Sequence, residues 1–379
     1  MYIAHLSTSV SLNQTVLNRM TFQKNNGHRV VALCPDDEWA EEIKSHDIRV
    51  IEVPFIRHSL LHSFSSAAMR TFSICKREQF DVVHTHTLLP GIAGRVAARL
   101  AGVPAVVHTF HSWPLHKTRG KAFTLIYKQL ELLAAFFGHA ILFQNRDDML
   151  CWSQIPGMPK NKAILVGNGI DCNAICSKVQ PNARESIRHE FGIGEDTTLI
   201  IMVARLELYK GHLILLDALR QILTSTDHKI FALFVGIGED RARIEEEVNR
   251  LGLKDIVRFT GYRLDVPNLL AASDISVLPS QYEGIPRALM ESMILGVPVV
   301  ATDVPGNRTL IRSGENGILV EYGDVNQFAL ALTDLLENPA LASGLSKQGK
   351  LTVLKEYDEY KVAARDEEIY RQLLHTGWS

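Results

Sequence analysis

Two cationic side chains, Arg205 and Lys210, lie close together in the segment VARLELYKG. Apolar residues up to Val203 form an expected strand and a helical pattern begins near His212, so both cations fall in the loop between them. An arginine can bind two oxygens of one phosphate through its fork, and a lysine supplies a movable point charge. The pair is therefore a candidate for holding a diphosphate, although this segment alone fits two solvated surface cations more simply.

A second set of candidate residues lies in SQYEGIPRALMESM. The loop after the expected strand Ile275–Leu278 carries Glu283 and Gly284, and Pro286 suits the first position of the following helix. A glycine lets backbone approach a ligand closely, and a helix N-terminus offers unpaired N–H groups. Glu291 falls between one and two turns into the helix, where its carboxylate can accept both hydroxyls of a ribose while Glu283 reaches a transferred sugar. Two ordinary solvated glutamates are the alternative interpretation.

Four histidines lie near expected strand ends in the first half of the chain, in DVVHTHTLLPG and VVHTFHSWPLH: His84, His86, His108 and His111. The spacing of His84 and His86 also occurs among metal ligands, so a metal-dependent hydrolase is an alternative function. That function is disfavoured because the further carboxylate and histidine ligands that it needs do not follow the later strands.

Short β-rich apolar runs alternate with longer helical patterns, which predicts parallel sheets covered by helices. The expected strands are Tyr2–Leu6, Arg29–Leu33, Arg49–Val53, Asp81–His84, Ala105–Thr109, Ala140–Phe143, Ala163–Val166, Leu199–Val203, Ile230–Val235, Val257–Thr260, Ile275–Leu278, Pro298–Ala301 and Ile318–Val320. The looser polar segment CNAICSKVQPNAR interrupts this alternation. We therefore expect an α/β protein with two doubly wound, Rossmann-like domains, residues 1–178 and 179–379. The residues from Asn326 to Leu374 are predicted to form consecutive helices, the last of which, about 358–379, is expected to pack on the first domain.

The length of 379 residues supports two domains, because one hydrophobic core rarely serves so long a chain. Hydrophobic residues at 46% and charged residues at 22% are typical of soluble globular proteins. Ligands of open α/β sheets bind outside the carboxyl ends of the strands. Two such domains facing each other would form a central cleft, which is a usual place for a small-molecule site.

The charges are divided unevenly, with 19 Lys and Arg against 13 Asp and Glu in residues 1–180 and 21 against 29 in residues 181–379. The basic first half suggests an anionic ligand or surface, or else two surfaces that merely differ. The longest apolar stretch, near 122–143, is interrupted by Lys128, Glu131 and His139, so we expect no transmembrane helix. The N-terminus does not resemble a secretory signal, and the five cysteines are scattered, which favours a cytoplasmic protein with neither disulfides nor a zinc site.

The segment EGIPRALMESM, with Glu283 and Glu291, is similar to the E-x7-E motif of family 4 retaining glycosyltransferases, and Arg205 and Lys210 match that family's diphosphate-binding pair. Further segments agree in family order: VGNGID, VGIGED, FTGYRLDVPNLLAASDISVLPS and GENGILV. The resemblance covers nearly the whole chain. It implies a GT-B fold, a nucleotide bound mainly by the second domain, and no metal or other cofactor. It also implies an enzyme of the kind that builds bacterial surface polysaccharide from a nucleotide-diphosphate sugar, with a UDP-sugar expected first.

By this resemblance, Arg205 and Lys210 would neutralise the departing diphosphate, and Glu291 would hold the ribose. Glu283 would contact the donor sugar, assisted by the backbone around Gly284 and Ile285. The other positions assigned to the donor are Pro286 at the helix start, Tyr262 and Arg263 beside the base, and Gly236 and Gly238 with room for the nucleotide. Retention would follow from attack on the face from which the diphosphate leaves, with a phosphate oxygen taking the acceptor's proton.

In the first domain, His111 matches a family histidine that faces the donor sugar near the reacting carbon. His86 is a candidate for the acceptor side, together with Ser9. Two departures weaken this part of the match. The segment STSVS replaces the adjacent glycines that approach the donor phosphate in many members, and Ser112 replaces the glycine that often follows the histidine.

The stretch from His111 to Lys128 is rich in basic and aromatic residues, Trp113 and Tyr127 among them. It suits anionic headgroups or a lipid diphosphate, and equally a solvated helix face. We expect a saccharide acceptor on a polyprenyl carrier, peripheral contact with the inner face of the cytoplasmic membrane, and no nucleic-acid partner. A non-catalytic nucleotide-sugar-binding subunit and a sugar-nucleotide epimerase of the same architecture are the alternatives, although an epimerase gives no reason for the E-x7-E spacing.

Overall fold

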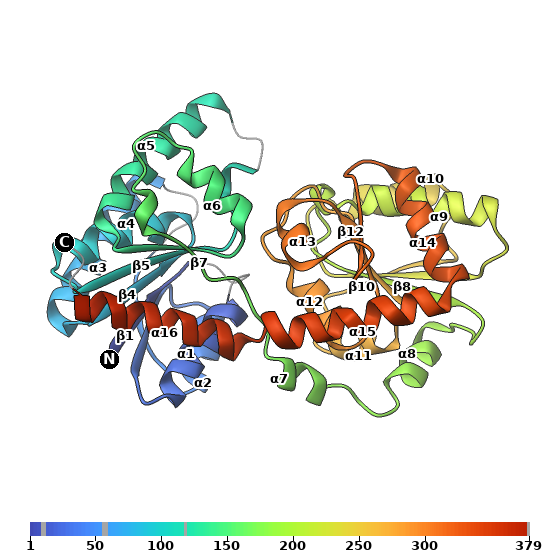
Figure 1. Cartoon of the computed structure of the whole chain (residues 1–379), viewed down its shortest axis with the longest axis horizontal. Coiled ribbons are helices and arrows are strands. Elements are labelled where there is room, and N and C mark those ends of the chain that lie inside the picture. The colour runs from blue at the N-terminus through green and yellow to red at the C-terminus, as the bar shows by residue number, and fades with distance from the viewer. Residues whose placement is uncertain (9–12, 55–59, 117–119, 377–379) are drawn as a thin grey trace. The chain divides into compact units, whose positions relative to one another are not determined.

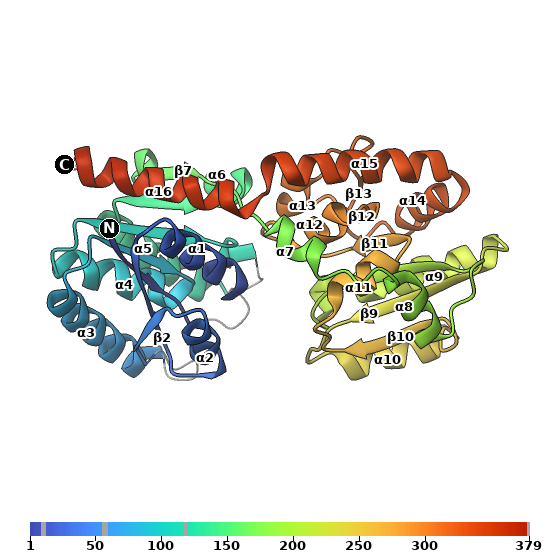
Figure 2. The ribbon, with the colours of Figure 1, turned by 90° about the horizontal axis from the view of Figure 1, so that it is seen from below.

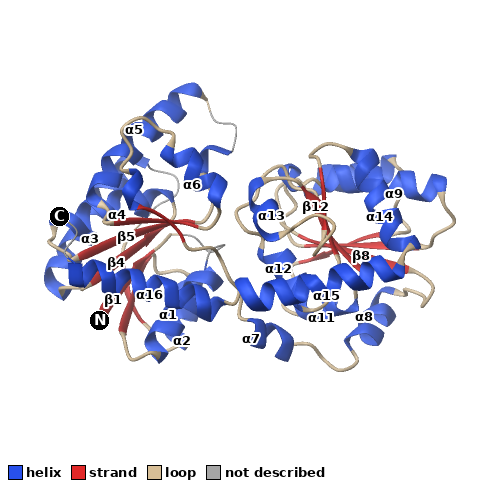
Figure 3. Ribbon diagram, viewed as in Figure 1, coloured by secondary structure: helices blue, strands red, loops and turns tan. Residues whose placement is uncertain are grey.

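The computed structural model describes residues 1–8, 13–54, 60–116 and 120–376. The chain divides into two compact units: unit 1 contains Met1–Asn168 and Glu359–Ser379, and unit 2 contains Gly169–Asp358. Each unit contains one parallel sheet with helices packed on both faces (Figures 1 and 3). Every strand expected from the sequence is present, with each end within two residues of its expected position. The predicted α/β class with two doubly wound sheets is confirmed.

The sheet of unit 1 has the strand order β3-β2-β1-β4-β5-β6-β7. Its strands are β1 (Tyr2–Leu6), β2 (Arg29–Cys34), β3 (Arg49–Glu52), β4 (Val82–His86), β5 (Ala105–Phe110), β6 (Ala140–Phe143) and β7 (Ala163–Leu165). Its helices are α1 (Asn13–Asn25), α2 (Glu38–Ser45), α3 (Leu60–Glu78), α4 (Leu88–Leu100), α5 (Lys121–Phe137), α6 (Arg146–Ser153) and α16 (Glu359–Thr376). All of the strand pairs are parallel, so the carboxyl ends of the strands share one edge of the sheet.

Successive residues of a strand point to opposite faces of a sheet, so the apolar strands of unit 1 contribute to two cores. Ile3 packs with Ile369 and Tyr370 of α16, whereas its neighbour Ala4 packs with Ile74 of α3. Helices α1, α2 and α16 cover one face of the sheet, and α3, α4 and α5 cover the other. Figure 2 shows α1 beside α16.

The last helix, α16, is fixed to unit 1 by buried charges as well as by its apolar face. Arg19 of α1 is completely buried and pairs with Glu359 at 3.2 Å and with Asp366 at 2.6 Å. Arg365 donates to the carbonyl oxygen of Val166 at 3.0 Å. A buried arginine without these carboxylates would carry an uncompensated charge, so α1 and α16 stabilise each other.

The sheet of unit 2 has the strand order β10-β9-β8-β11-β12-β13. Its strands are β8 (Thr198–Val203), β9 (Ile230–Val235), β10 (Val257–Gly261), β11 (Ile275–Leu278), β12 (Val299–Thr302) and β13 (Ile318–Val320). Its helices are α7 (Cys172–Ser177), α8 (Ala183–Phe191), α9 (His212–Ser225), α10 (Arg241–Arg250), α11 (Val266–Ala272), α12 (Arg287–Ile294), α13 (Pro305–Leu310), α14 (Val325–Glu337) and α15 (Pro339–Glu356). Strand β8 again supplies two cores: Ile200 packs with Leu215 of α9, and Leu199 packs with Leu269 of α11.

The units part at Asn168 and Gly169, before the boundary of 178 and 179 expected from the sequence. Ile170 and Cys172 belong to the core of unit 2, and the N–H of Ile170 donates to the carbonyl oxygen of Tyr357 at 2.9 Å. The polar composition of residues 172–184 suggested a domain boundary within this segment, but Cys172 and Ile175 of the segment pack in the core of unit 2 together with Ile170.

Candidate active site

Arg205 and Lys210 lie in the loop between β8 and α9, where the sequence predicts them. A 3-10 turn, Leu208–Lys210, closes this loop, and Gly211 follows with a φ of +83°. A Cβ atom at Gly211 would lie 1.9 Å from the carbonyl oxygen of Pro279, so a side chain does not fit there. This close contact holds the cationic loop against the segment that leaves β11 and carries Glu283.

Lys210 and Glu283 form an ion pair at the centre of this region, although 73 positions separate them in the sequence. Nζ of Lys210 donates to Oε1 of Glu283 at 2.6 Å, and the Ser280 hydroxyl donates to the same oxygen at 2.6 Å. Only 15% of the lysine side chain and 10% of the glutamate side chain are exposed. A pair so weakly solvated would be costly to leave broken, so Lys210 requires an anion in the place of Glu283 if the two separate.

Two stacked tyrosines, which the sequence analysis missed, lie beside this pair. The rings of Tyr209 and Tyr282 are 4.5 Å apart at 6°. The guanidinium of Arg205 lies 5.8 Å from the Tyr209 ring centre and donates to the Tyr209 hydroxyl, and Lys210 lies 5.2 Å from the same centre. Burial raises the pKa of both tyrosines, that of Tyr282 to about 12. The repeated tripeptides YKG and YEG, which place a tyrosine before each charged residue, are the signal that could have identified them.

Gly236 and Gly238 follow β9, but the space beside them is filled by backbone. A Cβ atom at Gly236 would lie 2.1 Å from the carbonyl oxygen of Ala204, and one at Gly238 would lie 2.2 Å from that of Leu206. Leu206 also exchanges backbone hydrogen bonds with Ile237 and Asp240 at 3.0 Å each. These glycines therefore permit the close approach of the Arg205 loop, rather than leaving open room as the sequence suggested.

The loop after β11 delivers Glu283, Gly284 and Ile285 to the start of α12, with Pro286 as the residue just before the helix. Expected as the first helical residue, Pro286 instead has a φ of −75° and a ψ of 117°, and Arg287 begins the helix. Ile285 is buried, with 5% exposed. The Gly284 carbonyl lies so close to Gly306 that a Cβ atom there would be 1.3 Å from its oxygen. Backbone packing thus fixes this loop.

Glu291 lies on α12, as predicted, and pairs with Arg287 one turn earlier at 3.0 Å. Its side chain is 17% exposed. The structure brings Arg205, Lys210 and Glu283 together around the tyrosines. The Glu291 carboxylate instead forms an ion pair with Arg287 on the same helix.

Tyr262 and Arg263 follow β10 and differ in how firmly they are held. Arg263 donates to Glu190 at 2.5 Å and to Asp265 at 2.7 Å, and these bonds, with Asp265 the stronger influence, raise the pKa of the guanidinium. Tyr262 is 71% exposed. Arg263 therefore has structural carboxylate partners, whereas the Tyr262 ring is available to a ligand.

In unit 1, His111 follows β5 and borders a cavity of about 210 Å³. Thr87, Leu88, His108, Thr109, Phe110, Ser112 and Pro114 also line this cavity. Thr87 has a φ of +64°, which is unusual for a β-branched residue and is typical of functional sites. His86, expected on the acceptor side, is completely buried between His5 and His111, which leaves no surface for an acceptor. Ser9, the other acceptor-side candidate, lies outside the described residues.

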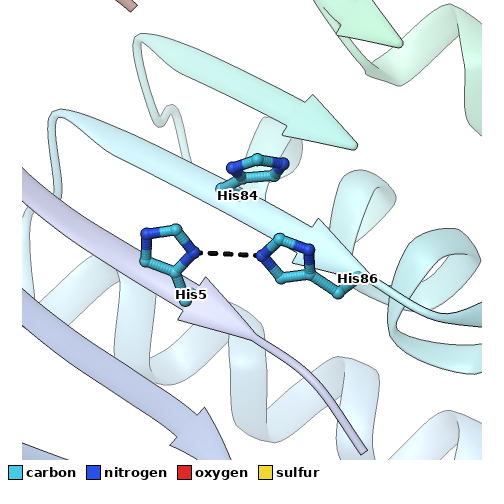
Figure 4. Close-up of side chains that lie close together, drawn as sticks. All are labelled: His5, His84 and His86. Atoms are coloured by element: carbon cyan, nitrogen blue, oxygen red, sulfur yellow. Dashed lines mark hydrogen bonds between the residues drawn. The ribbon is translucent and has the colours of Figure 1, made fainter. Parts of the chain in front are cut away.

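Three buried histidines, His5, His84 and His86, have ring nitrogens within 4.8 Å of one another, and residues of this type can hold a metal ion (Figure 4). His5, which no sequence motif identified, pairs in register with His84 between β1 and β4. All six ring nitrogens already have hydrogen-bond partners, and this group of described residues contains no carboxylate. A metal would have to displace those partners, so the geometry favours a hydrogen-bond network over the ligand set of a hydrolase.

Helix α5 presents an exposed apolar stripe that the sequence analysis did not identify. Its members are Leu125, Ile126, Leu130, Leu133 and Phe136, each at least 40% exposed. Trp113 and Tyr127, which the sequence placed in a surface-binding segment, are instead buried in the core of unit 1. The only acidic residue of this helix is Glu131, which is buried against Arg95 at 2.6 Å. The outer face of α5 therefore lacks negative charge.

Two family models match the chain. One, described as glycosyl transferases group 1, matches residues 183–352, and the other, described as glycosyltransferase family 4, matches residues 12–174. The chain belongs to glycosyltransferase family 4. The first model contains all of the site residues of unit 2, and the second contains His86 and His111.

The similarity to curated relatives extends along nearly the whole chain. The UDP-Gal:alpha-D-GlcNAc-diphosphoundecaprenol alpha-1,3-galactosyltransferase of Escherichia coli is 28% identical over 377 residues, which cover 97% of this chain and 96% of the relative. The putative glycosyltransferase EpsD of Bacillus subtilis (strain 168) is 28% identical over 296 residues, with 77% and 76% covered. The crystal structure of Anabaena HepE in complex with UDP and glucose has 21% identity and a TM-score of 0.85, with 98% of this chain and 100% of that one covered.

As a family 4 member, this protein is a glycosyltransferase that takes its sugar from a nucleotide sugar. Its two Rossmann-like units are those of the GT-B fold, as the resemblance implied. Across the described part of the chain, no helix has the length and apolar character needed to cross a membrane.

Proposed function

We propose that this family 4 enzyme is a retaining transferase that moves a hexose or N-acetylhexosamine from a UDP-sugar to a lipid-linked saccharide, in the synthesis of surface polysaccharide or glycan. The observation that carries the proposal is the convergence of Arg205, Lys210 and Glu283 beside the Tyr209 and Tyr282 stack. The Escherichia coli relative supports the substrate classes, because its name specifies UDP-galactose and a diphosphoundecaprenol acceptor.

The first step in the proposed reaction is an exchange of partners at Lys210. A donor diphosphate takes the place of Glu283 at the ammonium, and Arg205 turns from its neighbour Glu207 to the phosphate oxygens. Glu283 is thereby released toward the transferred sugar, where the backbone of Gly284 and Ile285 assists it. Two fixed cations supply the charge that a divalent ion supplies in other transferases, so the proposal includes no metal.

The nucleoside part of the donor is assigned to the same edge of unit 2. Glu291 accepts the ribose hydroxyls, with Arg287 as its partner in the free enzyme. The exposed Tyr262 ring stacks on the uracil base. Arg263 acts through Asp265 and Glu190, which hold the turn that presents the tyrosine. Pro286 immediately precedes α12, and the first N–H groups of this helix are assigned to the donor phosphate.

Transfer with retention requires that the bond to the acceptor form on the face that the diphosphate leaves. The bond between the anomeric carbon and the phosphate oxygen breaks, and the acceptor oxygen bonds to that carbon on the same face. The acceptor's proton passes to the departing phosphate oxygen. Arg205 and Lys210 stabilise the negative charge that remains on the departing UDP. His111 is assigned to the donor sugar, and Ser9 to the acceptor side, from the family resemblance.

We further propose that the apolar stripe of α5 rests on an anionic lipid surface at the inner face of the cytoplasmic membrane. Lys121 is exposed beside the stripe, and the helix has no exposed carboxylate to oppose a negative headgroup. An amphipathic helix with this composition suits the membrane interface. Such a site would bring the enzyme to an acceptor carried on a lipid diphosphate.

A direct test of the reaction uses purified enzyme with a panel of nucleotide-diphosphate sugars in a thermal-shift screen. The donor that stabilises the protein is then incubated with a synthetic GlcNAc-diphospholipid, and the anomeric configuration of the product is read by NMR. Transfer with retained configuration supports the proposal. Conversion of the donor to an epimer without acceptor would instead identify an epimerase, and donor binding without transfer to any saccharide lipid would identify a binding subunit.

The membrane contact is tested separately by sedimentation with anionic liposomes at low salt. Leu125→Glu and Leu133→Glu should each reduce the bound fraction, because each places a negative charge on the stripe. Leu330→Glu is the matched control, since Leu330 is 59% exposed on α14 of unit 2. Absence of binding by the unaltered protein, or equal loss in the control, would contradict the membrane site.

A further inference from the structure

A continuous chain of hydrogen bonds links five side chains of unit 1, from Gln23 to Gln144. Nε2 of His5 lies 2.8 Å from Oε1 of Gln23, and Nδ1 of His5 lies 3.0 Å from Nε2 of His86 (Figure 4). Nδ1 of His86 lies 3.1 Å from Nε2 of His111, and Nδ1 of His111 lies 2.9 Å from the amide nitrogen of Gln144. His5, His86, His111 and Gln144 come from the ends of β1, β4, β5 and β6, which are successive neighbours in the sheet.

The two ends of this chain determine where each proton lies. The Gln23 oxygen can only accept, so His5 must donate through Nε2, and Nδ1 of His5 must accept from Nε2 of His86. By the same reasoning, Nδ1 of His86 accepts from Nε2 of His111. Nδ1 of His111 is then the acceptor that the Gln144 amide nitrogen requires. With the Gln23 oxygen and the Gln144 amide nitrogen facing the rings and all three rings neutral, a single assignment satisfies every bond: each histidine carries its proton on Nε2.

The surroundings of His111 favour the neutral ring. The ionisable groups that face it or its partners are His5 of β1, His84 and His86 of β4, His108 of β5, Arg19 of α1, and Tyr370, Asp366 and Glu359 of α16. The carboxylates of α16 pair with Arg19. Burial and, secondarily, the charge of Arg19 lower the pKa of His111 to about 3. Burial also lowers the pKa of His5 to about 4 and that of His86 well below its ordinary value.

We propose that Gln23, His5, His86 and Gln144 are positioning residues that hold His111 as a neutral imidazole with its proton on Nε2. Gln23 and Gln144 terminate the chain of hydrogen bonds. The Gln23 amide oxygen accepts a hydrogen bond but does not become protonated, and the Gln144 amide nitrogen donates a hydrogen bond but cannot accept a proton. The chain therefore fixes a tautomer rather than conducting protons. His86 is thereby assigned to the support of His111 in place of the acceptor.

This arrangement has a consequence for transfer, which rests on the proposed function. Positive charge develops at the anomeric carbon as the diphosphate leaves, so an imidazolium beside the sugar would oppose the reaction. A neutral ring does not. The chain keeps His111 uncharged across the pH range in which a solvated histidine titrates.

The tautomers can be measured without any substrate. Long-range ¹H–¹⁵N spectra of protein labelled at its 15 histidines distinguish Nε2–H, Nδ1–H and doubly protonated rings. We expect His5, His86 and His111 to appear as neutral Nε2–H rings from pH 8 to pH 5. A ring of the three in the Nδ1–H form, or titration of His111 near pH 6.5, would overturn the proposal. A shift of the His5, His84 and His86 nitrogens on addition of Zn²⁺ to metal-bound values would overturn it in favour of a metal site.

Gln144→Glu and Gln144→Met form a matched pair of variants with similar side-chain volume. A carboxylate at position 144 requires a proton on Nδ1, so Gln144→Glu should convert His111 to an imidazolium and raise its pKa. Methionine removes the amide donor and adds no charge, so His111 should stay neutral with its proton on Nε2. The same His111 protonation state in the spectra of the two variants would contradict the proposal.

Kinetics then separate positioning from a structural role. Below the new pKa of His111, kcat of Gln144→Glu should fall about tenfold for each pH unit, and it should recover as the pH rises. The unaltered enzyme and Gln144→Met should show no such acid limb. If the spectra behave as expected and the acid limb is missing, the donor-sugar role of His111 fails while the tautomer chain stands. If the tautomers are absent, the chain fails whatever the transferase activity.

Discussion

At the carboxyl ends of its strands, unit 2 gathers charged side chains, whereas unit 1 gathers uncharged imidazoles. Lys210 and Glu283 form an ion pair with part of each side chain in contact with solvent. His86 is completely buried, and burial lowers its pKa well below the ordinary value. The difference shows two ways of preparing an edge of a parallel sheet for chemistry: unit 2 keeps charge available for an anion, and unit 1 excludes charge from a buried network.

The largest expected contrast between the units is their response to acid. Six histidines in the described part of unit 1 have lowered pKa values through burial: His5, His84, His86, His108, His111 and His139. Below about pH 6.5 the unfolded chain takes up protons that these folded residues do not, so stability is lost as the pH falls from about 6.5 toward the folded pKa values. Each such histidine contributes about 1 kcal/mol of lost stability per pH unit in that window.

Hydrogen exchange at pH 7 and pH 5.5, corrected for the intrinsic rates, measures this contrast. Peptides from β1, β4 and β5 should lose protection, and peptides from β8 and β9 should lose much less, because His212 is the corresponding buried histidine with a lowered pKa in the described part of unit 2. An equal loss of protection in the two units would contradict this contrast, because protonation of the buried histidines would then not destabilise unit 1 more than unit 2.

The charged edge of unit 2 is tested by Lys210→Ala and Arg205→Ala. Each should lower kcat on the order of a hundredfold, because each removes a positioned charge that stabilises the departing diphosphate. Lys229→Ala is a matched control, since Lys229 forms an exposed ion pair with Asp196 elsewhere in unit 2. A residue whose removal leaves kcat at the level of this control has no part in stabilising the leaving group.

The charged edge could be predicted from the sequence, whereas much of the histidine edge could not. Arg205, Lys210 and Glu283 lie next to strands in short segments, so the expected strand ends already bring them to one side of a sheet. His5 and Gln144 lie far apart in sequence in segments with no chemical signature, and only the strand order of unit 1 brings them near His86. Local spacing predicts which loop holds a residue, but the pairing of strands decides its neighbours.

Burial was the second property that the sequence did not determine. Trp113 and Tyr127 occur among basic residues and therefore resembled a surface-binding segment, but both rings pack in the core around Phe110. Leu125 and Leu133 are exposed on α5, the helix that also carries Tyr127. A helix that is apolar on most of its circumference does not show from its sequence which stripe faces the core.

A smaller effect is expected at Glu291, which distinguishes donor binding from chemistry within unit 2. Glu291→Ala should weaken UDP binding about tenfold, as expected for the loss of a charged acceptor to two hydroxyls, and should change kcat little. Isothermal calorimetry with UDP measures the affinity. Arg287→Ala removes the partner in the free enzyme and keeps the carboxylate, so it should retain most of the affinity. A greater loss in Arg287→Ala would assign the contact to the arginine.

The smallest expected effect concerns Tyr262, the exposed aromatic of the charged edge. Stacking of one ring on a base contributes about 1 kcal/mol, so Tyr262→Ala should weaken UDP binding about fivefold. Tyr262→Phe keeps the ring and should bind UDP as the unaltered enzyme does. Arg263, which is tied to Glu190 and Asp265, should matter for the turn rather than for the base, so Arg263→Ala should lower thermal stability as well as affinity. If Tyr262→Phe loses as much affinity as Tyr262→Ala, the Tyr262 hydroxyl makes the contact with UDP. This residue of unit 2 would then bind through a hydrogen bond, which is also the interaction that links the histidines of unit 1.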